Sequence, residues 1–174
     1  ASLRSSVVSQ AKSLGYEVSS ARAPIATVNI TLSTTAASKT MPAGTTFTTT
    51  VDGVSYQFVT IADITSNNIG NAINFDSTKI YEGTYVTSKY IVDTSDIEQS
   101  FTLTDPRADT TTLTVKVQNS VTDTTTTTYT KATDISQLSS SSTVYFLQEV
   151  DAGRFEVYFG DGVVSRAVSD GNIV

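Results

Sequence analysis

The side chains whose types could do chemistry gather near the end of the chain, where five carboxylates stand close together: Glu149, Asp151, Glu156, Asp161 and Asp170. A pair of carboxylates on either side of a cleft can cleave a glycosidic bond. Glu156, however, stands between Phe155 and Val157 in an alternating apolar pattern, so we expect it to point to solvent. Three of the aspartates lie in turn sequences, which Asp favours by its own hydrogen bonding. We interpret the set as solvated surface or turn carboxylates.

The run Gly160-Asp161-Gly162 could be taken for a phosphate-binding loop. A dinucleotide fingerprint needs a further spaced glycine between a strand and a helix. Here residues 154–159 alternate as a strand, and residues 163–168 are expected to run back as its partner strand. The sequence therefore predicts a hairpin turn at residues 160–162, with the next turn at Gly171, and no cofactor.

The chain lacks the residues that other common catalytic and metal sites need. The chain has no His and no Cys, which removes His-based triads, the commonest zinc ligand and any disulfide. The Asp-x-Asp-x-Asp-Gly calcium loop is missing, although a calcium site built from an isolated Asp and carbonyl oxygens stays open. Ser is so abundant that no single one indicates a nucleophile. We predict no catalytic residue, no metal site and no enzyme activity.

Composition indicates a β protein with a packed core. Of 174 residues, 39% are hydrophobic, and the polar ones are dominated by Ser and Thr, the latter a strand former. The 11 Lys and Arg are scattered against 17 Asp and Glu, a net charge of −6, so we expect no nucleic-acid binding. No apolar run is long enough to span a membrane. The absence of Cys fits synthesis in a reducing cytosol.

The spacing predicts a mainly β fold, α+β at most, of antiparallel sheets and hairpins with one short helix. Leu3, Val7, Ala11 and Leu14 share a helical face, so residues 1–20 are expected to form an N-terminal amphipathic helix. Residues 21–79 are expected to form a first β subdomain. Its turns are at Gly44 and at Asp52-Gly53, a strong two-residue hairpin signal. Residues 61–78 are interpreted as loop with one short strand.

Residues 80–174 are expected to form a second β subdomain, or else 80–140 is an insertion into a single domain. Strands are predicted within residues 80–93, 101–103, 112–118 and 144–149. The Thr run at 124–128 is either an extended hairpin arm or disordered, and residues 134–138 can form one helical turn. Because the chain opens at Ala1 and stops just after a turn, we expect a fragment of a longer protein.

The order of these pieces resembles the family of baseplate wedge protein six of T-even-like phages and the related baseplate J proteins of contractile tails. The segments that carry the resemblance are Leu14-Gly15-Tyr16, the strand around Pro24, Met41-Pro42-Ala43-Gly44-Thr45, Tyr56-Gln57-Phe58-Val59-Thr60, Tyr81-Glu82-Gly83, residues 109–117, 144–149 and Phe159-Gly160-Asp161-Gly162. The family often has a second glycine shortly after its Gly-Asp-Gly, where this chain has Ser165.

The resemblance implies a structural, non-enzymatic subunit of the virion tail baseplate. It implies a homodimer or higher ring that links neighbouring wedges, binds other wedge proteins and changes diameter when the sheath contracts. The alternative is an adhesive β domain that binds carbohydrate on a virion or cell surface. Such a domain would stack sugar rings on aromatic side chains, but Trp is absent and Tyr81, Tyr85 and Tyr90 are unevenly spaced. We therefore expect these tyrosines to pack in a core or an interface.

Overall fold

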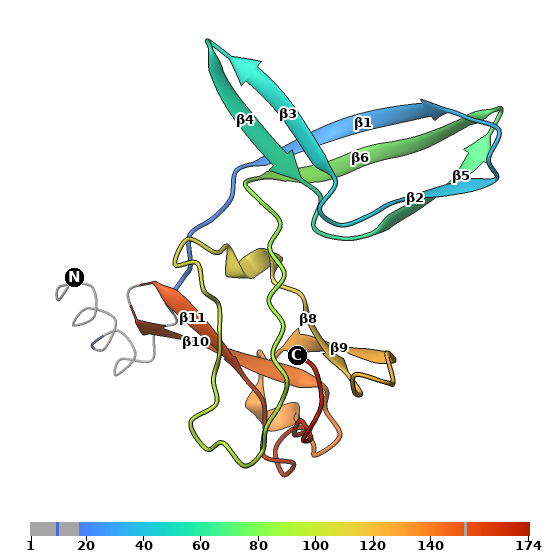
Figure 1. Ribbon diagram of the computed structural model, residues 1–174. Coiled ribbons are helices and arrows are strands. Elements are labelled where there is room, and N and C mark those ends of the chain that lie inside the picture. Colours follow the sequence, from blue (N-terminus) through green and yellow to red (C-terminus); the bar gives the residue numbers. More distant parts are fainter. Residues whose placement is uncertain (1–9, 11–17, 152) are drawn as a thin grey trace. The chain divides into compact units, whose positions relative to one another are not determined.

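The computed structural model describes residue 10, residues 18–151 and residues 153–174, and within them the chain is mainly β (Figure 1). It divides into two compact units, residues 23–87 and residues 88–174 together with the described residues before position 23. The N-terminal helix predicted over residues 1–20 lies outside the described residues except at Gln10 and residues 18–20, and residues 18–20 are not helical. No helix in the described part is both long and apolar enough to cross a membrane.

The unit of residues 23–87 holds six strands around β6. In chain order they are β1 (Ile25–Ser33), β2 (Ser38–Met41), β3 (Thr46–Val51), β4 (Val54–Val59), β5 (Ile64–Ile69) and β6 (Ala72–Glu82). β1 pairs with one edge of β6 along its whole length. The other edge of β6 pairs with β5 at one end and with β4 at the other, and the sheet continues to β2 and β3. The apolar face packs Met41, Ile73 and Phe75 together.

Two tight turns set the hairpins of this unit. Asp52 and Gly53 have φ of 50° and 80°, which two-residue hairpins need at both central positions, so the hairpin predicted there is confirmed. Gly70 and Asn71, with φ of 64° and 65°, make the same kind of turn between β5 and β6. The interpretation of residues 61–78 as mostly loop is therefore wrong, because β5 and much of β6 occupy them.

A β-bulge in β6 explains why its apolar pattern is irregular. Val28 pairs with Thr78, but Ile30 pairs with Phe75, so β6 holds an extra residue opposite Asn29. Ser77 takes a left-handed φ of 51° there, and its N–H donates to Asn29 Oδ1 at 2.7 Å. Because the extra residue shifts the alternation, Phe75 and Thr78 are both buried although they are three positions apart. A search for regular alternation of apolar and polar residues misses such a strand.

The unit of residues 88–174 holds a five-stranded sheet in the order β7-β11-β10-β9-β8. Its elements are β7 (Phe101–Thr102), η1 (Thr110–Thr112), β8 (Val115–Gln118), β9 (Thr126–Lys131), η2 (Ile135–Gln137), β10 (Val144–Asp151) and β11 (Arg154–Tyr158). The Thr run thus lies largely in an extended hairpin, and the helical turn at 134–138 is present as η2, capped by Asp134. β9 and β10 are parallel, which departs from the antiparallel pairing expected throughout. Their connection, residues 132–143, is the dozen or so residues that a parallel crossover needs.

The strand predicted at residues 163–168 is wrong. β11 pairs instead with β10 on one edge and with the short β7 on the other. Both edges of β11 are therefore occupied within the sheet, and the chain after Phe159 leaves the sheet as irregular structure. Its alternation of Phe155, Val157 and Phe159 is as predicted: the first two are 4% exposed and Phe159 packs against the core.

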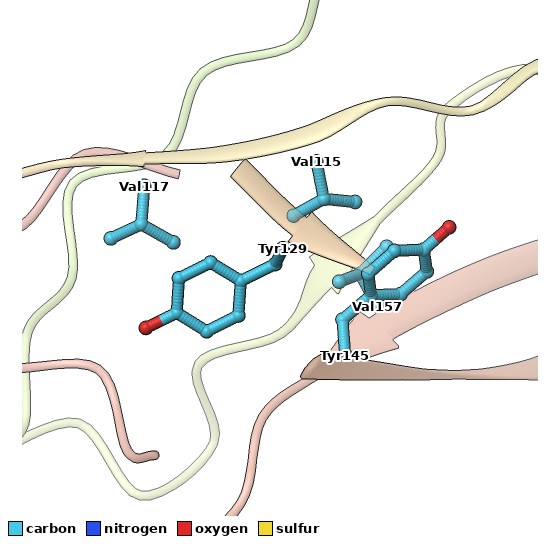
Figure 2. Close-up of a cluster of buried hydrophobic side chains, with 5 residues drawn as sticks. All are labelled: Val115, Val117, Tyr129, Tyr145 and Val157. Atoms are coloured by element: carbon cyan, nitrogen blue, oxygen red, sulfur yellow. The ribbon is translucent and has the colours of Figure 1, made fainter. Parts of the chain in front are cut away.

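The core of this unit is built from valines and tyrosines of several strands. Figure 2 shows Val115, Val117, Tyr129, Tyr145 and Val157 gathered together. Burial raises the pKa of the Tyr129 and Tyr145 hydroxyls, because the phenolate form loses hydration. The C-terminal residues close the core: Val174 exchanges two backbone hydrogen bonds of 2.9 Å with Tyr90, and Ile173 bridges to Gln118.

Replacing Asn29 with Ala tests the bulge. The variant leaves the Ser77 N–H without its side-chain acceptor, so we expect the free energy of unfolding to fall by about 0.5–1.5 kcal/mol. Urea unfolding followed by circular dichroism measures it. Thr27→Ala is the matched control, since Thr27 is exposed on the same strand. An equal loss in both variants would contradict a specific role for Asn29.

Candidate functional site

The five C-terminal carboxylates do not converge on a cleft. Asp161 Oδ1 accepts from the Val163 N–H at 2.9 Å, and Asp170 Oδ1 accepts from the Thr94 N–H at 3.1 Å. Glu156 is half-buried. The expectation that the set is solvated is wrong for Glu149, which is 5% exposed and accepts from the Gly153 N–H at 3.0 Å. This bond closes the turn between β10 and β11. The side chain of Asp151 lies outside the described part.

Aspartates hold the loops of residues 88–174 through one repeated contact. The side chain accepts a hydrogen bond of 2.8 to 3.0 Å from the backbone N–H two residues on, at Asp93, Asp96, Asp105, Asp109, Asp123, Asp134 and Asp161. Side-chain hydrogen bonds from Ser95, Arg107, Asn119 and Ser136 are the main cause that lowers the pKa below its ordinary value of 3.8 at Asp93, Asp105, Asp123 and Asp134, and the backbone N–H groups add to it. At Asp161 the backbone N–H of Val163 is the main cause of the lowered pKa. In the described residues no three acidic side chains are grouped in a way that could hold a metal ion. These seven aspartates therefore hold the loop backbone by accepting hydrogen bonds from its N–H groups.

Gly160 is constrained by a close contact. A Cβ at position 160 would lie 1.9 Å from Ser165 Oγ and 2.8 Å from the Ser165 carbonyl oxygen. Ser165 is fully buried, and its Oγ has no hydrogen-bond partner within the described structure. The Ser165 carbonyl oxygen accepts from the Gly162 N–H at 2.9 Å. Residues 160–165 thus form a compact loop in which Gly160 is needed for space rather than for a left-handed φ.

The other glycines singled out from the sequence have left-handed backbones. The φ angles are 80° at Gly44, 80° at Gly53, 87° at Gly162 and 77° at Gly171. Gly44 also lies under the ring of Tyr85, whose Cδ1 is 3.3 Å from where a Cβ would be. These residues shape turns, and none of them lines a described ligand site.

The three tyrosines singled out from the sequence belong to two different units. Tyr81 and Tyr85 belong to the unit of residues 23–87, whereas Tyr90 belongs to the other unit. Tyr90 donates its hydroxyl to the Thr102 carbonyl at 2.6 Å and packs edge-on against Phe101. Its ring is therefore used inside its own unit. Carbohydrate binding stays a prediction, which a glycan array would test.

A projecting hairpin is the surface that sequence reasoning did not single out. The outer part of the β3–β4 hairpin, residues 48–57, is exposed at every position, and Figure 1 shows it leaving the rest of its sheet. Val51 and Val54 are each 53% exposed, and Tyr56 is 37% exposed. A two-stranded hairpin with little burial is marginally stable by itself. The available signal was the Thr-rich, nearly uncharged sequence around the Asp52-Gly53 turn.

The second unit matches a known protein family. Residues 86–174 match the family described as bacteriophage baseplate wedge protein gp6, third domain. This span starts two positions before the compact unit of residues 88–174 and ends with it. None of the curated proteins searched matches the chain.

Gly160→Ala tests the close contact with Ser165. Overpacking of this kind costs about 1–3 kcal/mol, so we expect lower stability in urea unfolding. Ser165→Ala is expected to be neutral or stabilising, because it removes a buried hydroxyl without a partner. The double variant should recover part of the loss, since the Oγ contact is gone while the carbonyl contact remains. Strictly additive effects would argue against direct contact.

Acid should destabilise the loops of residues 88–174. The carboxylates with lowered pKa contribute stability above their unfolded value of 3.8, and this stability is lost as the pH falls through the lower, folded-state pKa. We expect the free energy of unfolding to decrease from about pH 4 downward, measured by urea unfolding at a series of pH values. Asp161→Asn keeps an acceptor oxygen without the titration, so its pH dependence should be shallower. If the free energy of unfolding of Asp161→Asn falls with pH as steeply as that of the wild type, Asp161 does not contribute to the acid sensitivity.

Proposed function

The chain belongs to the bacteriophage baseplate wedge protein gp6 family, and from this premise we propose that it joins neighbouring wedges into a ring. Its role is structural, it belongs to the tail baseplate of the virion, and it associates with other baseplate proteins. The proposal adds that copies of this chain self-associate as a dimer or larger ring. It also adds that this ring changes geometry when the tail contracts.

The single observation that carries the proposal is the family match over a whole structural unit. Residues 86–174 include the complete β7–β11 sheet and the C-terminal residues that close its core. The family's third domain thus coincides with a complete β sheet and its core.

The placement of polar groups supports a structural role over catalysis. Three of the five carboxylates that could have formed an acid and base pair bind backbone N–H groups in separate turns: Glu149, Asp161 and Asp170. A general acid or base needs a free proton site within reach of a substrate. We propose on this ground that the chain has no catalytic residue. Synthesis in the host cytoplasm remains part of the proposal.

Sedimentation of the protein tests self-association. We expect a dimer or larger species at tens of micromolar, and association with other wedge proteins of the same phage when they are mixed. A protein that stays monomeric and joins no wedge protein would overturn the proposal.

A further inference from the structure

The β3 strand has one free edge. β3 stands at the end of its sheet and pairs only with β4. Val51 and Val54 flank the two-residue turn and so form a hydrogen-bonded pair, as do alternate pairs below them. The backbone N–H and C=O groups of the residues between point the other way, toward the free edge. These residues are Thr46, Thr48 and Thr50.

This edge lacks the features that usually block edge pairing. Residues 46–51 hold no charged side chain, no Pro and no register shift. The β1 edge, by contrast, belongs to a strand pair kinked by the bulge, and the short β2 carries Lys39. β8 is covered by Ile173, and at the base of β4 the Gln57 carbonyl accepts from the Gly83 N–H. Of the two uncharged edge strands β1 and β3 in the sheet of residues 23–87, only β3 has a pairing without a register shift.

Thr46, Thr48 and Thr50, whose backbone groups point to the free edge, can pair with the same three residues of a second copy. An antiparallel pair of β3 strands centred on Thr48 places Thr48 opposite Thr48, and Thr46 of one copy opposite Thr50 of the other. Such a pairing makes roughly six backbone hydrogen bonds, and its cross-strand contacts on that face are all Thr–Thr. It is a two-fold arrangement in which both copies use the same surface. Val51 at each tip then lies opposite Thr45 of the other copy.

Charge also favours a second copy at this place. The chain carries a net charge of −6, so two copies repel over most of their surface. Between residues 46 and 57 the only charged residue is Asp52, and antiparallel pairing keeps the two Asp52 residues at opposite ends. The exposed Val51, Val54 and Tyr56 add apolar area that a neighbouring strand partly covers.

We propose that two copies of this chain pair antiparallel through β3, edge to edge and centred on Thr48. This inference deepens the proposed self-association and rests on it, because it names the surface that performs it. The pairing would also give a partner to a hairpin whose residues 48–57 are all exposed.

Single cysteines test the register, since the chain has no Cys of its own. Opposed residues of a hydrogen-bonded antiparallel pair have Cα atoms about 5.5 Å apart, within disulfide range. Thr48→Cys is therefore expected to give a disulfide-linked dimer as the main species under mild oxidation, scored on a non-reducing gel. Thr50→Cys is the matched control: its two substituted positions would be about 14 Å apart across the pair, so it should remain largely monomeric. A mixture of Thr46→Cys and Thr50→Cys should cross-link.

Equal cross-linking by Thr48→Cys and Thr50→Cys, or none by either, would overturn the register. A second measurement needs no cysteine. Thr48→Lys places like charges opposite each other and is expected to weaken self-association about tenfold or more in sedimentation. Ser55→Lys adds the same charge to the other strand of the hairpin and should change it little. A wild type that dimerises while Thr48→Lys has no effect refutes the β3 edge alone, whereas a monomeric wild type without cross-links refutes self-association as well.

Discussion

Loop backbone N–H groups must find acceptors, and in residues 88–174 aspartate side chains provide them. Seven aspartates bind the N–H two residues on, and Glu149 closes the β10–β11 turn from a buried position. This contact fixes loops that would otherwise depend on water, because short strands leave much of the chain outside the sheet. The acidity of the protein thus follows from how its loops are held.

The same hydrogen bonds distinguish these carboxylates from the usual catalytic carboxylate. A catalytic carboxylate keeps an oxygen free for substrate, and its pKa is commonly raised toward neutrality. Here the resolved shifts of aspartate pKa are downward, and the causes are hydrogen bonds from nearby backbone and side chains. The groups are held for structure, as befits the third domain of a baseplate wedge family.

Local sequence predicted the features that depend on adjacent residues. Asp52-Gly53 predicted a hairpin because a two-residue turn needs positive φ at both central positions, which Asp and Gly tolerate. The alternation of Phe155, Val157 and Phe159 predicted which face of that strand is buried. Residues 163–168 alternate less clearly and were expected to return as a strand. They do not, since β10 and β7 already occupy both edges of β11. Edge competition among distant strands leaves no trace in a short window of sequence.

By itself the sequence determined the mainly β character, the lack of His and Cys chemistry, and the turns at its Gly-containing pairs, because these follow from residue types and short-range geometry. Only the tertiary structure decided the parallel β9–β10 pair, the bulge that buries Phe75 and Thr78 together, and the burial of Glu149. It also decided that Gly160 is needed to make room for Ser165. The parallel pair and the bulge depend on which strands pair across long separations, and that pairing is decided only when the whole sheet forms. The burial of Glu149 and the contact of Gly160 with Ser165 depend on the path of the folded backbone, which residue types alone do not give.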